Sequence, residues 1–468
     1  MDRAIVGLFL LSVMIFSIII ISNASPFVYD EGTYAVMVGG FSSNPSIVEP
    51  TVAGVQVEWK PPLFTWVYSA FYVFLGKLPL SVEAQFRLPS ALFGAADVVL
   101  VYMIGNLLYG RKIGIAAALL FLTTPLTFFS STLMMMESFS LFLALSSIYL
   151  YLTGNLPGGS IFLGLLVFTK WLYAFVPAMF VALYFLRDKR LPAVLASFLA
   201  IPIFLIVRLF IAFYFGNIDN AIGNLVFDLW RPAPSSNPFW IFYNFTSVFL
   251  TLPLSWVFIW SLASFKIDLR KELPVFAVCL LMFLLPLSGM FIYWYLIIIT
   301  PALVLFIAAR IFQDGGGKMS AILVIALMVI NLAFTGAFLL PMLTSGIQDL
   351  PRVASFMENK SVVFIEPQHF YGDWDYANSQ YANSTESFLL LEEFNPGILY
   401  YRFSAMDDYS NLKAYFGQNA SGLPCQDYLV VHEYPGTTVT IPSCFNQLWQ
   451  TPDYSVYSVQ SPIPQIVK

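Results

Sequence analysis

The sequence predicts a mainly α-helical, polytopic membrane protein with a smaller α/β domain at its C-terminal end. Three observations predict this class. Of the 468 residues, 59% are hydrophobic and only 10% are charged, whereas soluble domains carry roughly 25% charged residues. Apolar runs of bilayer-spanning length recur along residues 1–341. Beyond residue 341 the chain changes to alternating polar and apolar stretches.

Eleven apolar runs are expected to cross the membrane. The first is interpreted as a retained span rather than a signal peptide, because its apolar run is long and no small-residue cleavage site follows it. The stretch 160–186 is interpreted as two half-length or tilted passes that meet near Lys170, because Pro177 interrupts it. The expected spans are 4–22, 88–109, 113–131, 138–153, 160–176, 177–186, 191–215, 246–264, 273–289, 291–309 and 319–341.

The aromatic stretch 62–76 is interpreted as a helix in the outer membrane interface, because it is short and flanked by lysines. With a cytosolic N-terminus, nearly all basic loop clusters then lie in the cytosol, as the positive-inside rule requires. The odd number of spans places the C-terminus outside. Two large extracytoplasmic segments follow: 23–87, and an α/β domain over 342–468 with strands expected at 361–365, 398–401 and 428–431.

Charge and cysteine content exclude several classes of function. The net charge is −5 and no long basic block occurs, which argues against nucleic acid as a partner. No Cys/His spacing typical of a zinc site is present. Cys279 lies in an apolar run and is expected to be a packed thiol. Cys425 and Cys444 lie in the outer domain, where an oxidising environment favours a disulfide between them.

Ionisable side chains from four separate segments meet on the outer face of the predicted topology. Solvated loops, interfacial anchoring and snorkelling explain some of them. Those that border spans fit these explanations poorly, because charges there are costly and usually face a cavity or a partner. The set consists of Asp30, Glu31, Glu58 and Lys60 in the first outer segment, Arg87 at the start of the second span, Glu137 before the fourth, and Lys170 at the outer end of the fifth.

This set suits chemistry on an anionic, lipid-linked substrate. The cations Lys60, Arg87 and Lys170 can stabilise a phosphate leaving group. A carboxylate such as Asp30 or Glu31 can take the proton of an acceptor hydroxyl.

Two further roles stay open at this stage. Asp30, Glu58 and Glu137 together can hold a divalent metal ion, because hard cations prefer oxygen ligands. The sequence does not distinguish whether such a carboxylate is a catalytic base or a metal ligand. Asp97 and Arg208 lie deeper in spans, where they either form a buried structural ion pair or Arg208 approaches the phosphate.

The order of these motifs resembles the GT-C membrane glycosyltransferases, in particular the protein O-mannosyltransferases and the lipid A aminoarabinose transferases. The resemblance covers about residues 1–310. Its motifs are Asp30-Glu31 with Tyr34, then Glu58-Trp59-Lys60-Pro61-Pro62-Leu63, then Arg87-Leu88-Pro89-Ser90-Ala91-Leu92, then Glu137, then Thr169-Lys170, and finally Tyr295 with Pro301.

The resemblance implies an inverting transfer of a monosaccharide, such as mannose, from a dolichyl- or undecaprenyl-phosphate donor to a protein, lipid or glycan on the outer face. It implies a catalytic carboxylate or metal neighbour at Asp30, next to Glu31, and a second acid at Glu137. Lys60, Arg87 and Lys170 would bind the donor phosphate, with Tyr34, Glu58 and Tyr295 in support. The alternatives are a polytopic transporter, which would predict midplane charges and repeated halves, and a non-catalytic membrane receptor.

Overall fold

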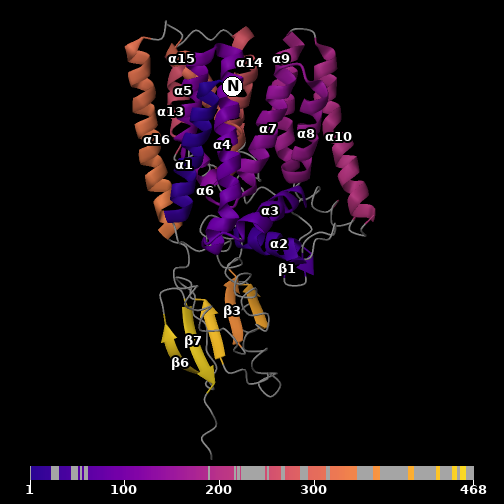
Figure 1. Cartoon of the computed structure of the whole chain (residues 1–468), viewed down its shortest axis with the longest axis vertical. Coiled ribbons are helices and arrows are strands. Elements are labelled where there is room, and N and C mark those ends of the chain that lie inside the picture. Colours follow the sequence, from indigo (N-terminus) through magenta and orange to yellow (C-terminus); the bar gives the residue numbers. More distant parts are fainter. Residues whose placement is uncertain are drawn as a thin grey trace, which may run out of the picture. The chain divides into compact units, whose positions relative to one another are not determined.

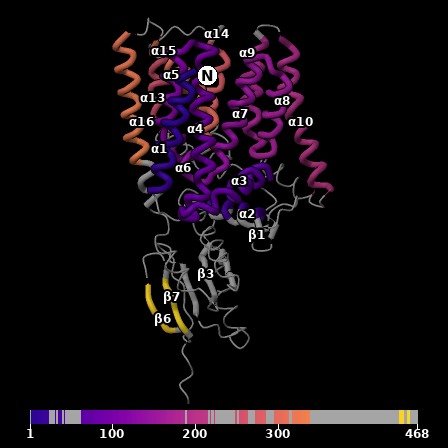
Figure 2. Tube along the Cα trace, in the orientation of Figure 1, coloured from indigo at the N-terminus to yellow at the C-terminus, as the bar shows by residue number. Residues whose placement is uncertain are grey.

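The computed structural model describes most of the N-terminal three quarters of the chain and five strands beyond it (Figure 1). Residues outside this description are grey in Figure 2. The chain divides into a helical unit (Met1–Ala24, Met37–Thr51 and Gln56–Met342) and a second unit (Ser25–Val36, Val52–Val55 and Leu343–Lys468). The described residues are 2–22, 31–43, 51–52, 55–56, 62–187, 190–214, 218, 222, 248–249, 252–264, 269–284, 293–312, 317–344, 362–368, 399–404, 428–432, 445–450 and 454–459.

Helices make up nearly all of the described helical unit. Apolar side chains occupy most helical positions, so each helix can bury one side against its neighbours and leave the other for lipid. In chain order the helices are α1 (Arg3–Ser22), α2 (Glu31–Ser43), α3 (Pro62–Leu75), α4 (Val82–Tyr109), α5 (Arg111–Leu122), α6 (Pro125–Thr132), α7 (Met136–Leu152), α8 (Leu156–Lys170), the 3-10 turn η1 (Trp171–Ala174), α9 (Phe175–Arg187), α10 (Leu191–Tyr214), α13 (Leu254–Ser264), α14 (Leu269–Leu284), η3 (Tyr293–Ile298), α15 (Thr300–Phe312) and α16 (Lys318–Thr344).

Five helical runs of the described chain are long and apolar enough to cross a membrane, and six if a bent pair counts as one span. They are Arg3–Ser22, Val82–Tyr109, Leu156–Leu186, Leu191–Tyr214 and Lys318–Ala337, with the bent pair Arg111–Leu122 and Pro125–Thr132. The chain is therefore a membrane protein. The total of eleven spans stays a prediction. Leu156–Leu186 forms one candidate span where two half-length passes were expected, and its backbone leaves the helical region at Lys170 (φ −135°, ψ 88°).

Helix α3 has the length expected of an interfacial helix. Its 14 residues extend about 21 Å at the helical rise, which is short of the roughly 30 Å hydrocarbon core. Figure 1 shows α3 inclined across the long helices rather than along them.

The third expected span, 113–131, is a bent pair of helices that passes as a candidate span only when the pair is taken together. Helices α5 and α6 meet at a bend of 66° around Thr123 and Thr124. Such a break frees backbone carbonyls, which need new donors inside a membrane. Helix α16 supplies them: the Asn331 amide donates to the Leu120 carbonyl (3.3 Å), and the Thr335 hydroxyl donates to the Thr123 carbonyl (3.1 Å).

Small residues let α4 and α5 pack with their backbones in close approach. A Cβ atom built on Gly105 would lie 2.8 Å from the Cα of Gly114, and one on Gly114 would lie 2.7 Å from the Tyr102 carbonyl oxygen. Membrane helices use such small residues because lipid gives little hydrophobic driving force for helix association.

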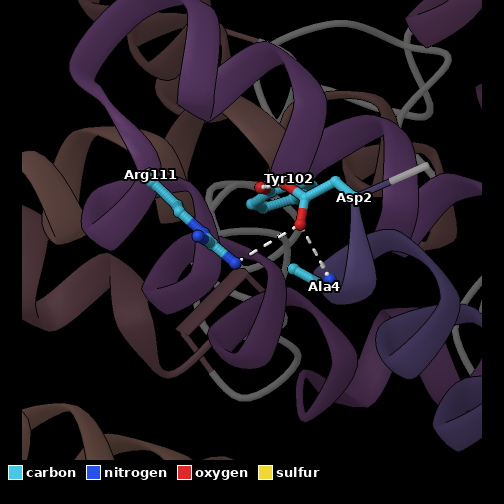
Figure 3. A network of polar contacts seen from close by, with 4 residues as sticks. All are labelled: Asp2, Ala4, Tyr102 and Arg111. Carbon is cyan, nitrogen blue, oxygen red and sulfur yellow. Dashed lines mark hydrogen bonds and ion pairs between the residues drawn. The ribbon is translucent and has the colours of Figure 1, made fainter.

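The start of α1 is joined to the α4–α5 turn by a polar network (Figure 3). The Asp2 carboxylate accepts hydrogen bonds from the Tyr102 hydroxyl and from the backbone N–H of Ala4 (3.0 Å), which caps α1. Arg111 adds an ion pair at 3.3 Å. These donors, led by Tyr102, lower the pKa of Asp2 below its usual value.

The second unit contains a five-stranded mixed sheet in the order β4-β3-β5-β7-β6. Strands β4, β3 and β5 are parallel, while β7 pairs antiparallel with both β5 and β6. The three expected strands are present, and β6 and β7 were not predicted. The bounds are β3 (Val362–Gln368), β4 (Leu399–Ser404), β5 (Tyr428–His432), β6 (Phe445–Gln450) and β7 (Tyr454–Val459), with a separate pair β1 (Thr51–Val52) and β2 (Val55–Gln56).

Candidate functional site

A buried ion pair between Glu137 and Lys170 is the centre of the candidate site. Glu137 lies in the first turn of α7 and is 1% exposed, while the Lys170 side chain ends α8 and is 16% exposed. Each charge has the sign that its helix end favours, since helix N-termini attract anions and C-termini attract cations. Removing two charges from water costs several kcal/mol per ion. The pair is therefore a costly feature that packing alone does not explain.

Two tyrosine rings enclose the Lys170 ammonium group. Its Nζ atom lies 5.1 Å from the ring centroid of Tyr173 in η1 and 4.4 Å from that of Tyr295 in η3. The two rings meet edge to face, with centroids 5.9 Å apart. Cation–π contacts of this kind hold an ammonium group without neutralising its charge. Lys170 thus keeps a fixed position from which its charge can act on an anion.

The site contains polar atoms that lack hydrogen-bond partners among the described residues. They are the second carboxylate oxygen of Glu137, Oε2, and the phenol oxygen of Tyr173. Both residues are at least nine-tenths buried. Because unsatisfied buried polar groups are destabilising, they commonly mark positions where water or a ligand binds.

Arg87 is buried within α4, not placed at the mouth of its span. Helix α4 begins at Val82, earlier than predicted, because the Ser81 hydroxyl caps it by accepting from the Ala84 N–H (3.2 Å). Arg87 consequently lies in the second turn and is 1% exposed. This burial within the protein rules out snorkelling to lipid headgroups as its role.

Glu31 and Tyr34 lie in the first turn of α2, in the second unit, and both are buried. Glu31 is therefore not a solvated loop residue, which corrects that interpretation of it. Glu31 lies at a helix N-terminus, where a negative charge is favoured.

Several predicted residues lie outside the described residues: Asp30, Glu58 and Lys60 of the first segment, and the Cys425–Cys444 pair. Their roles stay predictions. The metal hypothesis therefore has one described ligand, Glu137, whose Oε1 binds Lys170. Among the described residues no group of three His, Cys, Asp or Glu side chains could hold a metal ion.

The predicted ion pair between Asp97 and Arg208 is wrong. Both side chains are buried, but no ion pair joins them, and Asp97 Oδ1 has no hydrogen-bond partner among the described residues. A different pair, Arg310 with Glu272, links α15 to α14. Spans two and seven are distant in sequence, so their relative rotation could not be inferred from hydropathy.

Two neighbours of the site were not predicted. Tyr173 follows Lys170 by three residues, a spacing that places side chains on one helical face and could have indicated it. Tyr68 in α3 binds the Ser90 hydroxyl at 2.9 Å. No sequence signal distinguishes Tyr68 from the other aromatic residues of α3.

Comparison with known proteins places this geometry in a known fold. Neither a family model nor a curated protein matches the sequence. Among solved structures, ArnT from Cupriavidus metallidurans bound to undecaprenyl phosphate is similar with a TM-score of 0.64 at 14% identity, covering 97% of each chain.

The Archaeoglobus fulgidus oligosaccharyltransferase in its apo form is similar with a TM-score of 0.60 at 11% identity, covering 92% of this chain and 69% of that one. The same enzyme, AglB, with an inhibitory peptide and a dolichol-phosphate gives a TM-score of 0.53. These structural neighbours are GT-C glycosyltransferases. The chain therefore has the GT-C fold.

Proposed function

We propose that this GT-C fold belongs to a membrane glycosyltransferase, which moves a monosaccharide from a polyprenyl-phosphate donor to an acceptor on the outer membrane face. The single observation that carries the proposal is the caged, buried Lys170–Glu137 pair. A desolvated cation in a fixed position is well suited to a phosphate leaving group. The similar structures support the donor class, since ArnT is bound to undecaprenyl phosphate and AglB to a dolichol-phosphate.

The proposed reaction is a direct displacement at the anomeric carbon of the donor sugar. The acceptor oxygen forms a bond to that carbon while the bond to the phosphate oxygen breaks, which inverts the configuration. Polyprenyl phosphate leaves with the bonding electrons, and its charge is stabilised by Lys170, Arg87 and Lys60. The acceptor proton passes to Asp30 or Glu31.

Glu137 has a separate part in this proposal. In the resting protein it neutralises Lys170 through Oε1. A donor phosphate would replace or share that contact, so the ammonium group is never left buried without an anion. This exchange keeps the cation from costing the resting protein several kcal/mol of desolvation.

The proposal is tested by following labelled sugar from undecaprenyl-phosphate and dolichyl-phosphate donors in protein-containing nanodiscs with added membrane acceptors. Lys170→Met is expected to lower kcat/KM by about 10²-fold or more, the typical cost of removing one group that stabilises developing charge. Lys77→Met, at an exposed position in the turn that follows α3, is the matched control and is expected to transfer normally. Asp30→Asn tests the proposed base in the same assay.

Equal transfer by wild type and Lys170→Met would overturn the role of Lys170, and equal transfer by Asp30→Asn would overturn the catalytic assignment. Absence of transfer by the folded wild type with either donor would contradict the enzyme function. In that case retained binding of polyprenyl phosphate would favour the transporter or receptor alternatives.

A further inference from the structure

We propose that Tyr68 is a positioning residue for the proposed transfer, because its hydroxyl bonds α4 three residues from Arg87 while its ring contacts α7 two residues from Glu137. This inference rests on the proposed function and extends it to a residue that does not itself need to touch the donor. The hydroxyl bonds Ser90 of α4 at 2.9 Å, and the ring meets Phe139 of α7 edge to face with centroids 6.4 Å apart.

Tyr68 contacts both helices that carry the two charged residues, α4 through its hydroxyl and α7 through its ring. Tyr68 and Ser90 are hydrogen-bonded at 2.9 Å, and both are buried. Ser90 follows Arg87 by three residues in α4, so the two lie on the same side of that helix. Phe139, whose ring contacts that of Tyr68, follows Glu137 by two residues in α7. Loss of the hydroxyl bond releases α4 from α3, which carries the ring contact with α7, so we expect the placement of Arg87 relative to the Glu137–Lys170 pair to change.

The same helix also holds α2. The neighbouring Ser69 hydroxyl donates to the Val38 carbonyl at 3.0 Å. Val38 belongs to α2, whose first residue is Glu31. Helix α3 thus binds α2 through Ser69 and α4 through Tyr68, which are consecutive residues. The anchored helices carry a proposed phosphate-binding residue and a proposed catalytic carboxylate.

The ring and the hydroxyl of Tyr68 have separable roles. The ring packs among Phe64, Phe93 and Phe139, with centroid distances of 4.1, 6.0 and 6.4 Å. This packing holds α3 in place and would remain with phenylalanine. Burial raises the pKa of the phenol, so the hydroxyl stays protonated and can donate. Tyr68→Phe therefore removes the hydrogen bond to Ser90 and leaves the packing of the ring in place.

The matched control is Tyr151→Phe. Tyr151 is buried, and its hydroxyl binds Ser160 at 2.7 Å between α7 and α8. Both variants thus lose one tyrosine–serine hydrogen bond between two helices. Tyr151 lies in the last turn of α7, whereas Glu137 lies in the first. Similar losses of melting temperature are expected for both variants, since the lost interactions are of the same kind.

Of these two tyrosine variants, only Tyr68→Phe is expected to impair transfer. Misplacement of the two charged groups should lower kcat/KM for the lipid donor by about tenfold to a hundredfold. The acceptor KM should stay unchanged. Ser90→Ala should give a smaller loss in the same direction, and the Tyr68→Phe/Ser90→Ala double variant should be no worse than Tyr68→Phe. A purely structural role would instead lower the active fraction and leave the donor KM as it is.

Hydrogen–deuterium exchange separates this inference from the proposed function. Exchange along α3 should rise in Tyr68→Phe and not in Tyr151→Phe. If the wild type transfers sugar and Tyr68→Phe has the wild-type donor KM and kcat, the positioning role is overturned. If the wild type transfers nothing, the enzyme proposal fails, and the exchange data still decide whether Tyr68 ties α3 to its neighbours.

Discussion

Replacing Glu137 by glutamine tests the energetic account of the Lys170 site. The variant keeps the shape of the side chain and removes its charge. Lys170, 16% exposed, is then left without its anion. Removing one partner of a buried ion pair costs about 3–5 kcal/mol. The faces of Tyr173 and Tyr295 still hold the ammonium group, and desolvated cation–π contacts are worth about 2 kcal/mol. A net loss of about 1–3 kcal/mol in the free energy of unfolding is expected from these two terms.

The companion measurement is a double-mutant cycle with Lys170→Met. The double variant Glu137→Gln/Lys170→Met removes both charges, and it is expected to be more stable than Glu137→Gln alone, because no uncompensated charge stays buried. Unfolding would be followed by tyrosine and tryptophan fluorescence during denaturant titration in mixed micelles. A coupling energy of at least about 1.5 kcal/mol is expected. Strict additivity of the two single variants would refute the reasoning, as would an unchanged midpoint for Glu137→Gln.

Three further perturbations test the fold that supports the site. Gly114→Ala places a methyl group against the backbone of α4 and should cost about 1–3 kcal/mol in the free energy of unfolding. The control Gly7→Ala, with no heavy atom within 4 Å of the added methyl group, should be neutral or stabilising. Equal denaturation midpoints for the two variants would contradict the close packing of α4 and α5. Asn331→Leu should loosen the α5–α6 break by about 1–2 kcal/mol, and Thr335→Val should show a smaller loss by the same denaturant titration. Because the pKa of Asp2 is lowered in the folded protein, its ionised carboxylate stabilises the fold fully above the unfolded pKa of about 3.9, and this stabilisation is lost as the pH falls through the lower folded pKa. Asp2→Asn should abolish this loss of stability at acid pH. Identical pH profiles of melting temperature for wild type and Asp2→Asn would contradict the role of Asp2.

Composition and hydropathy were sufficient for the class of protein and for much of the helix inventory. Apolar runs predicted α1, α4 and α10 closely, because a span is a local property of about twenty consecutive residues. The short, aromatic stretch after Lys60 was predicted as a helix that does not span, and α3 has that length. These features depend on residues that are neighbours in the sequence, so they can be predicted from the sequence alone.

The bend between α5 and α6 was not predicted, because hydropathy alone was used for the run 113–131. Thr124-Pro125 in this run is a helix-breaking signal. What the sequence could not give is the stabilisation of the break by Asn331 and Thr335, from a helix some two hundred residues away. The same limitation explains the wrong pairing of Asp97 with Arg208. Hydropathy gives the depth of a residue along its helix and leaves the rotation of that helix against its neighbours undetermined.

The sequence by itself determined that the chain crosses membranes and which charged residues are unusual in such a chain, because the cost of a charge in lipid depends on residue type and local surroundings. Tertiary structure alone decided which of those charges meet. It brought Glu137 to Lys170 from separate helices, enclosed the ammonium group between Tyr173 and Tyr295, and placed the Tyr68 hydroxyl against Ser90. Contacts between distant helices depend on how side chains pack around each axis, and no local pattern specifies that rotation.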